Sequence, residues 1–185
     1  MATISAWGCH SSRLGLFALA IALAGTGIAV AREGPAPAAP LPIIGHHQPG
    51  PDATAAVARI RSLYETDMVI DEADPASANA WFSPGLAADM IRLYSRPGSY
   101  GIGFGYLVDG QDSELSAITY AFQNAGTDGH PAVRVRFTNF GEPIDLEFML
   151  GDGGCIANIR SRAPDGTEKW NLHDTVIDAL RDPGP

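Results

Sequence analysis

Residues 132–150 constrain the fold of this chain more than any other stretch, because two runs of alternating side chains flank a short turn. The first run, 132–138, alternates apolar residues with arginines, and the second, 143–150, alternates apolar residues with acidic ones. Such alternation is typical of β-strands that bury one face. Residues 139–142 between the runs include a glycine, so we predict a β-hairpin with a four-residue loop.

The charges of the two runs select one register for this hairpin. Folding about the loop places Arg134 opposite Glu147. It also places Arg136 opposite Asp145. The same register brings apolar residues face to face: Val133 with Phe148 and Val135 with Leu146. A slip by one residue would break both sets of pairs, so this register is strongly specified.

Helical spacing of apolar residues predicts three helices outside the hairpin. The first begins after Asp52, which is expected to cap it, the second covers 83–94, and the third covers about 170–181. Between the first two, residues 71–77 are predicted to form a polar turn broken by Pro75.

Further strands are expected on both sides of the hairpin, at 114–123 and 155–160, with a short strand at 104–108. Helices followed by antiparallel strands and a last helix form an α+β order. We therefore predict an α+β fold, in which a curved antiparallel sheet of about four strands wraps on the N-terminal helices and a C-terminal helix follows.

The start of the chain is expected to be an export signal over residues 1–31. A basic start, an apolar run and small residues up to Ala31 form the three-part pattern of a cleaved signal peptide. Cleavage there would leave a Pro-rich linker over 32–52 and one domain over 53–182. The alternative is an uncleaved anchor, since 14–31 is uncharged and just long enough to span a bilayer. We expect the protein to be periplasmic or secreted.

Composition argues against several classes of partner. The formal net charge is −9, whereas binding to nucleic acid or an anionic membrane needs a basic surface. Residues 100–105 are glycine-rich, but the glycines alternate with bulky residues and no helix follows to bind a phosphate. No Cys/His/Asp cluster has metal-ligand spacing. We expect no nucleic acid, no membrane contact after cleavage, no metal and no cofactor, and a homodimer through the outer sheet face stays open.

Several short stretches add a resemblance to these patterns. The chain resembles an uncharacterised family of exported bacterial proteins, a domain of unknown function with a nuclear transport factor 2-like, cystatin-like cone fold, at residues 81–86, 109–112, 133–150 and 154–159. It departs from the family at Gly154, where a tryptophan usually opens the last strand, and at Asn158, which replaces an aspartate. The resemblance implies a cone-shaped sheet and transfers no catalytic residues.

In such a cone, the apolar face of the hairpin would line a pocket under the helices. The residues expected to form this pocket are Tyr64, Tyr94, Ile118, Val133, Val135, Phe137, Leu146 and Phe148. The arginines and acids of the hairpin would then lie on the outer, exposed face, where each pair adds little. An interior of hydrocarbon favours binding of a small apolar ligand, or of a partner protein on the sheet, over catalysis.

Catalysis remains the alternative. The resemblance implies relatives such as ketosteroid isomerases and scytalone dehydratases, which place an acid, a Tyr or a His in an apolar pocket. The runner-up polar site here would use Asp112, Tyr120 and His173. We thus expect an exported, non-catalytic binding module, with a small isomerase, dehydratase or hydrolase as the alternative. Export, small size and acidity also motivate a third hypothesis, an immunity-type inhibitor of a secreted protein.

Overall fold

The computed structural model describes residues 52–182 except positions 67 and 127. The expected signal peptide and nearly all of the expected linker lie outside the described residues. Within the part of the chain that is described, no helix is both long enough and apolar enough to cross a membrane.

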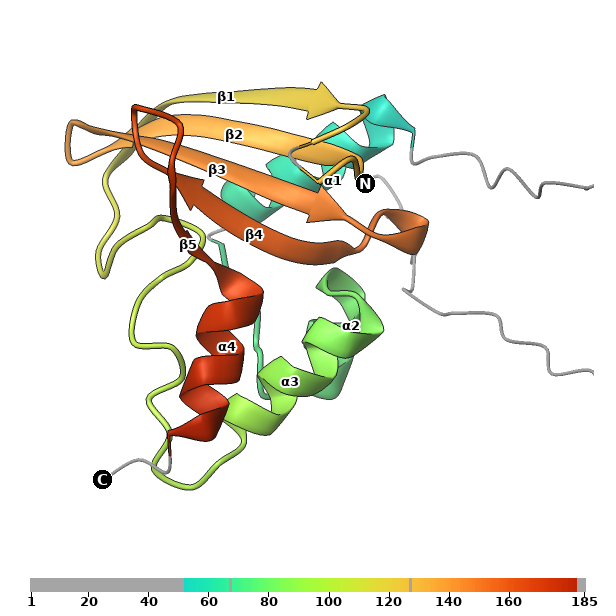
Figure 1. Ribbon diagram of the computed structural model, residues 1–185, viewed down its shortest axis with the longest axis vertical. Coiled ribbons are helices and arrows are strands. Elements are labelled where there is room, and N and C mark those ends of the chain that lie inside the picture. The colour runs from blue at the N-terminus through green and yellow to red at the C-terminus, as the bar shows by residue number, and fades with distance from the viewer. Residues whose placement is uncertain (1–51, 67, 127, 183–185) are drawn as a thin grey trace, which may run out of the picture. The chain divides into compact units, whose positions relative to one another are not determined.

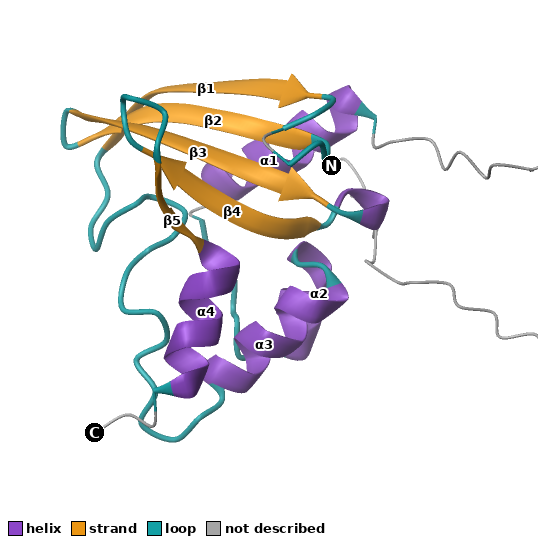
Figure 2. Ribbon diagram, in the orientation of Figure 1, coloured by secondary structure: helices purple, strands orange, loops and turns teal. Residues whose placement is uncertain are grey.

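The fold is α+β, as predicted, and contains one open antiparallel sheet (Figures 1 and 2). The five strands follow one another in chain order: β1 (Leu115–Gln123), β2 (Ala132–Asn139), β3 (Glu142–Leu150), β4 (Ile156–Arg162) and β5 (Glu168–Asn171). The prediction of about four strands missed β5. Its residues 170 and 171 pair with β4, although helical spacing assigned them to the last helix.

Four helices accompany the sheet: α1 (Ala53–Glu65), α2 (Pro75–Trp81), α3 (Pro84–Tyr94) and α4 (Leu172–Arg181). A short 3-10 turn, Asp152–Gly154, joins β3 to β4. Helix α1 lies across one face of the sheet, whereas α2, α3 and α4 lie beside β4 and β5 (Figure 1). The expectation that both leading helices cover the sheet is therefore met by α1, while α3 packs chiefly against α2 and α4.

Two local predictions were wrong. Residues 71–77 do not form only a turn, because Pro75 occupies the first position of α2. Proline suits that position, and the Asp74 side chain caps the helix by accepting the Ser77 N–H at 2.9 Å. The expected strand at 104–108 is instead a series of turns with one isolated bridge between Gly105 and Gly110.

The hairpin has the register that the charges predict: Arg134 is paired with Glu147 and Arg136 with Asp145. Its loop is shorter than expected, since Phe140 and Gly141 alone separate β2 from β3. Both have positive φ, 50° and 81°, as a two-residue type I′ turn requires. A bulky side chain is unfavourable in this conformation.

Replacing Phe140 with asparagine is expected to raise the free energy of unfolding by about 1 kcal/mol, because asparagine tolerates the left-handed conformation better. The phenyl ring is 59% exposed, so its removal sacrifices little burial. Urea denaturation measures the change. Phe140→Ala is the control, since it removes the ring and keeps the Cβ strain. An asparagine variant no more stable than the alanine variant would contradict the prediction.

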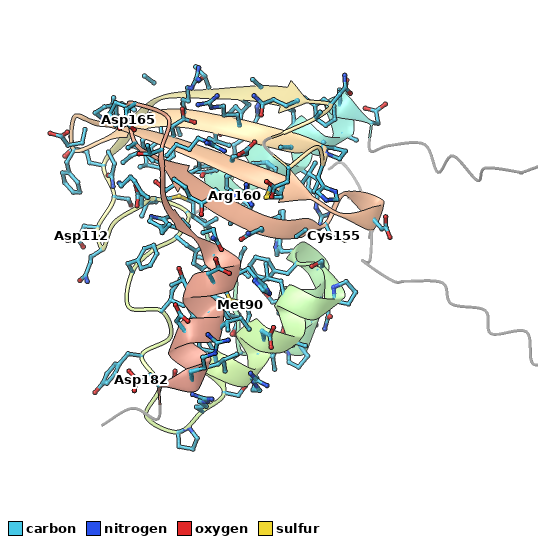
Figure 3. The ribbon with its side chains drawn as sticks, viewed as in Figure 1. Met90, Asp112, Cys155, Arg160, Asp165 and Asp182 are labelled. Carbon is cyan, nitrogen blue, oxygen red and sulfur yellow. The ribbon has the colours of Figure 1, made fainter. Side chains whose placement is uncertain are left out.

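One hydrophobic cluster joins the helices to the sheet. Its largest fully buried side chains come from α1, α3, α4, the strands and the connection between α2 and α3: Ile60, Leu63, Phe82, Met90, Leu146, Phe148, Ile156, Ile159 and Leu172. Figure 3 labels Met90, which lies where α3 approaches α4. Buried side chains thus occupy the part of the core between α1 and the hairpin, where the sequence predicted a pocket.

Candidate functional site

A cavity of about 250 Å³ lies between the loop that joins α1 to α2 and the loop that joins α3 to β1. Its lining combines aromatic, aliphatic and polar groups: Met68, Glu72, Tyr94, Phe104, Gly105, Tyr106, Leu107, Val108 and Ser113. Pockets that bind small molecules commonly combine apolar side chains with a few polar groups.

Among the lining residues that the structure describes, Glu72 is the one acidic residue. Its Oε1 accepts a hydrogen bond from the Tyr106 hydroxyl at 2.6 Å. Burial, followed by the charge of Glu72, raises the pKa of Tyr94 to about 12. The same two causes raise the pKa of Tyr106 well above its ordinary value. Both phenols therefore keep their protons at physiological pH, and Tyr106 donates its proton in the hydrogen bond to Glu72.

A glycine makes room for one of these phenols. Gly101 has a φ of +63°, and a Cβ built there would lie 2.5 Å from Cε1 of the Tyr94 ring. Any other residue would be strained and would displace the ring. The glycine-rich segment 100–105 thus includes one glycine that makes room for the Tyr94 ring, which lines the cavity.

The loop that carries Phe104 to Val108 is anchored by a buried carboxylate. Asp109 accepts hydrogen bonds from Ser161 Oγ at 2.8 Å, Lys169 Nζ at 2.6 Å and Trp170 Nε1 at 2.6 Å. The Asp109 side chain is only 7% exposed. These contacts hold the loop against β4 and β5, so they fix the position of one cavity wall.

Side chains from the core hold the same loop by its backbone. The Tyr64 hydroxyl donates to the Leu107 carbonyl at 2.9 Å. Asn139 Nδ2 donates to the carbonyls of Val108 and Asp112, each at 3.1 Å. Several independent contacts thus fix the position of this wall.

The residues expected to line a cone pocket occupy other places, with one exception. Tyr94 lines the described cavity. Tyr64 packs its ring against Tyr120, Phe137 and Phe148. Ile118 is half-buried against the core. The residues of the hairpin are buried within the core: Val133, Val135, Phe137, Leu146 and Phe148. The cone pocket itself stays a prediction.

The three residues of the runner-up polar site lie on separate elements. Asp112 lies in an exposed turn that Figure 3 labels. Tyr120 lies on β1, with the Arg61 guanidinium 5.1 Å from its ring centroid. His173 lies in the first turn of α4, and its Nδ1 is 3.5 Å from Asp174 Oδ1. Among the described residues, no hydrogen bond or ion pair joins any two of the three.

The outer face of the hairpin is less exposed than predicted. Glu147 is only 2% exposed, and its Oε2 accepts a hydrogen bond from Arg162 at 2.7 Å. The β1–β2 loop covers it, since a Cβ at Gly126 would lie 2.8 Å from Glu147 Oε1. The expectation of an exposed ladder was therefore wrong at this position. Glu147 and Asp145 do not, however, belong to the lining of the described cavity.

Arg134 does not bond to Glu147, the residue opposite it in the register, but to Asp145. Its guanidinium donates twice to Asp145, at 2.6 Å each, and Arg136 adds a third bond at 3.0 Å. Burial alone would raise the pKa of Asp145, but the hydrogen bonds from the two arginines outweigh it and lower that pKa. Asp145 therefore stays ionised and serves as the centre of a structural cluster.

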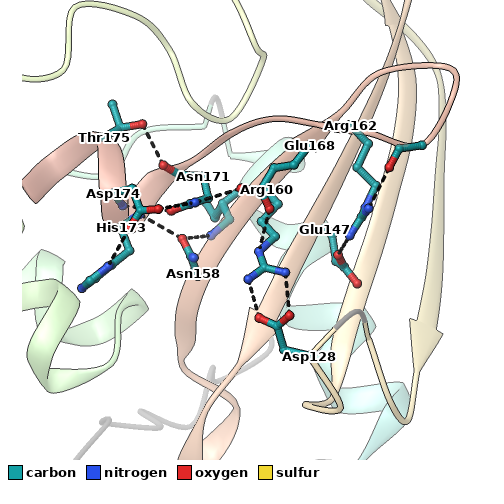
Figure 4. A network of polar contacts seen from close by, with 12 residues as sticks. Asp128, Glu147, Asn158, Arg160, Arg162, Glu168, Asn171, His173, Asp174 and Thr175 are labelled. Carbon is teal, nitrogen blue, oxygen red and sulfur yellow. Dashed lines mark hydrogen bonds and ion pairs between the residues drawn. The ribbon is translucent and has the colours of Figure 1, made fainter. Parts of the chain in front are cut away.

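A second polar network joins the β1–β2 loop to β4, β5 and the start of α4 (Figure 4). Arg160 donates to both oxygens of Asp128 and forms an ion pair with Glu168 at 3.2 Å. Asn171 then links Glu168 to Asp174, at 2.9 and 2.8 Å. Because each carboxylate in the network has a donor, we interpret it as structural. The described residues include no group of three His, Cys, Asp or Glu that could hold a metal ion.

Sequence reasoning missed Glu72, Phe104 and Tyr106. All three lie in connections without periodic patterning, where Met68 and Asp109 have positive φ. The only available signal was an acid in a polar turn and an aromatic run broken by glycines, and neither places the two loops side by side. No family model, curated protein or solved structure significantly matches the chain.

Proposed function

We propose that this protein is an exported, non-catalytic module that binds a small ligand in the cavity between the α1–α2 and α3–β1 loops. The observation that carries the proposal is the lining: a carboxylate oriented by Tyr106 lies among aromatic and aliphatic groups on a preorganised loop. Export rests on the N-terminal sequence pattern, and the resemblance to cone-fold proteins is compatible with an α1 helix packed across the sheet.

A small pocket enzyme is the second candidate, because Glu72 and Tyr106 converge within 2.6 Å. In that case Glu72 would take a proton and the phenols would stabilise a developing oxyanion. Binding is favoured because the described lining residues include no His, Cys or Lys that could complete an acid–base pair with Glu72. Turnover of a carbonyl compound that Glu72→Gln abolishes would favour the enzyme.

The immunity-type inhibitor remains a third hypothesis. It rests on the net charge of −9 together with the proposed export. This hypothesis predicts that the exported protein co-purifies with one basic protein partner, and purification without such a partner would count against it.

Replacing Ser113 with tryptophan is expected to block the cavity without unfolding the protein, because Ser113 is an exposed lining residue. Native mass spectrometry of protein purified from the periplasm should show a retained small molecule in the wild type and at least a tenfold lower occupancy in the variant. Ala58→Trp, at an exposed position of α1, is the control and should retain the ligand.

A complementary experiment uses amide chemical shifts during a screen of small-molecule fragments. Fragments should shift the signals of residues around the cavity in the wild type and in Ala58→Trp, and not in Ser113→Trp. If no fragment shifts these signals and the purified protein carries no molecule, the proposed function is wrong.

A further inference from the structure

No basic residue among the described lining residues balances the charge of Glu72. Its Oε1 accepts the Tyr106 hydroxyl, and no hydrogen bond from a described residue reaches Oε2. Among the residues that the structure describes, no Lys, Arg or His forms an ion pair with it. The hairpin acid Asp145, in contrast, is bonded to two arginines. A half-buried carboxylate without such a partner is suited to receive a cation from a ligand.

Three aromatic residues share the lining with this carboxylate: Tyr94, Phe104 and Tyr106. Each ring is supported from outside the cavity. The Phe104 ring stands edge-on to Trp170 at 5.0 Å, and the Tyr106 ring packs on Phe82 at 6.3 Å. The Tyr94 ring lies where only glycine fits at position 101. Aromatic faces attract organic cations, and rings that are already fixed lose little entropy on binding.

The size of the cavity and the net charge of the chain narrow the range of ligands further. A cavity of 250 Å³ holds about eight water-sized groups, which suits a small ligand better than a nucleotide. The acidic chain, with a net charge of −9, attracts cations and repels anions at long range. The sulfur of Met68 and the methyl groups of Leu107 and Val108 belong to lining residues that suit alkyl substituents.

We infer that the ligand is a small organic cation, an alkylammonium or quaternary ammonium compound, whose charge lies against Glu72 and the aromatic rings. This inference rests on the proposed function, since it assumes that the cavity binds a ligand. The cationic group would face Glu72 Oε2, while Tyr106 keeps Oε1 occupied and thereby fixes the orientation of the carboxylate.

The test is calorimetric titration of the protein with matched probes. Choline is compared with its uncharged isostere 3,3-dimethylbutan-1-ol, and butylammonium with butan-1-ol. Each cation is expected to bind at least tenfold more tightly than its neutral partner. Glu72→Gln preserves the shape of the side chain and should weaken cation binding at least tenfold. Asp112→Asn removes one negative charge from an exposed turn of the α3–β1 loop and should leave binding unchanged.

The outcomes separate this inference from the proposed function. If the neutral probes bind as tightly as the cations, or if Glu72→Gln leaves cation binding unchanged, the cation inference is wrong. Binding of any probe that Ser113→Trp removes would still support the cavity as a ligand site. If neither cation binds and neutral fragments still shift the signals of cavity residues, the ligand class is wrong and the proposed function stands.

Discussion

Replacing Glu147 with alanine is expected to lower the free energy of unfolding by about 3 kcal/mol, because the change leaves the Arg162 guanidinium without its carboxylate. Removing one partner of a buried ion pair costs about 3–5 kcal/mol. The lower end applies here, since the Arg162 side chain is 14% exposed and also donates to the Gly166 carbonyl at 3.1 Å. Urea denaturation at neutral pH measures the loss.

Glu142→Ala is the matched control, because Glu142 begins the same strand and is exposed. Its effect should stay within about 0.5 kcal/mol. Glu147→Gln should lose less than the alanine variant, since the amide oxygen can still accept from Arg162. Equal stabilities of the Glu147→Ala and Glu142→Ala variants would show that the buried pair contributes nothing.

This buried pair illustrates what the hairpin sequence can and cannot predict. The register of β2 and β3 follows from alternation and charge within one short segment, so it is correctly predicted. Burial of Glu147 depends on Arg162 from β4 and on the β1–β2 loop that passes over it. The sequence of the hairpin alone indicates neither contact. A prediction from the pairs between β2 and β3 therefore places Glu147 on an exposed face.

The helices likewise include starts that the local sequence predicts and one that it does not. Asp52 accepts the Ala55 N–H at 2.9 Å, as its predicted capping role requires. Helix α3 has nearly the predicted bounds and begins at Pro84, whereas Pro75 begins a helix in a segment that was predicted as a turn. Proline both breaks helices and begins them, so the interpretation depends on the residues that follow. The seven-residue α2 is too short to show a clear apolar period.

The cavity lies beyond such local reasoning because loops alone provide most of its lining. The carboxylate of Glu72 lies beside the rings of Phe104 and Tyr106 because the α3–β1 loop is anchored to the sheet. That anchoring depends on Asp109, which has a φ of 52° and contacts residues more than fifty positions later in the chain. Asp109 therefore links the stability of the fold to the geometry of the proposed binding site.

Replacing Asp109 with alanine is expected to lower the free energy of unfolding by about 3 kcal/mol, because buried donors lose their acceptor at about 1–3 kcal/mol each. The hydroxyl of Ser161, a residue with no exposed surface, and the indole N–H of Trp170 would be left without it. Alanine also tolerates the positive φ less well than aspartate. Thermal and urea denaturation measure the loss.

The same variant should weaken ligand binding, since the released loop carries the aromatic and aliphatic residues from Phe104 to Val108 that line the cavity. Asp109→Asn keeps one acceptor oxygen and the tolerance of positive φ, so its losses should be smaller on both measures. Asp112→Ala, in the exposed part of the same loop, should change stability by no more than about 0.5 kcal/mol. An Asp109→Ala variant as stable as Asp112→Ala, with unchanged binding, would mean that the cavity wall does not depend on this anchor.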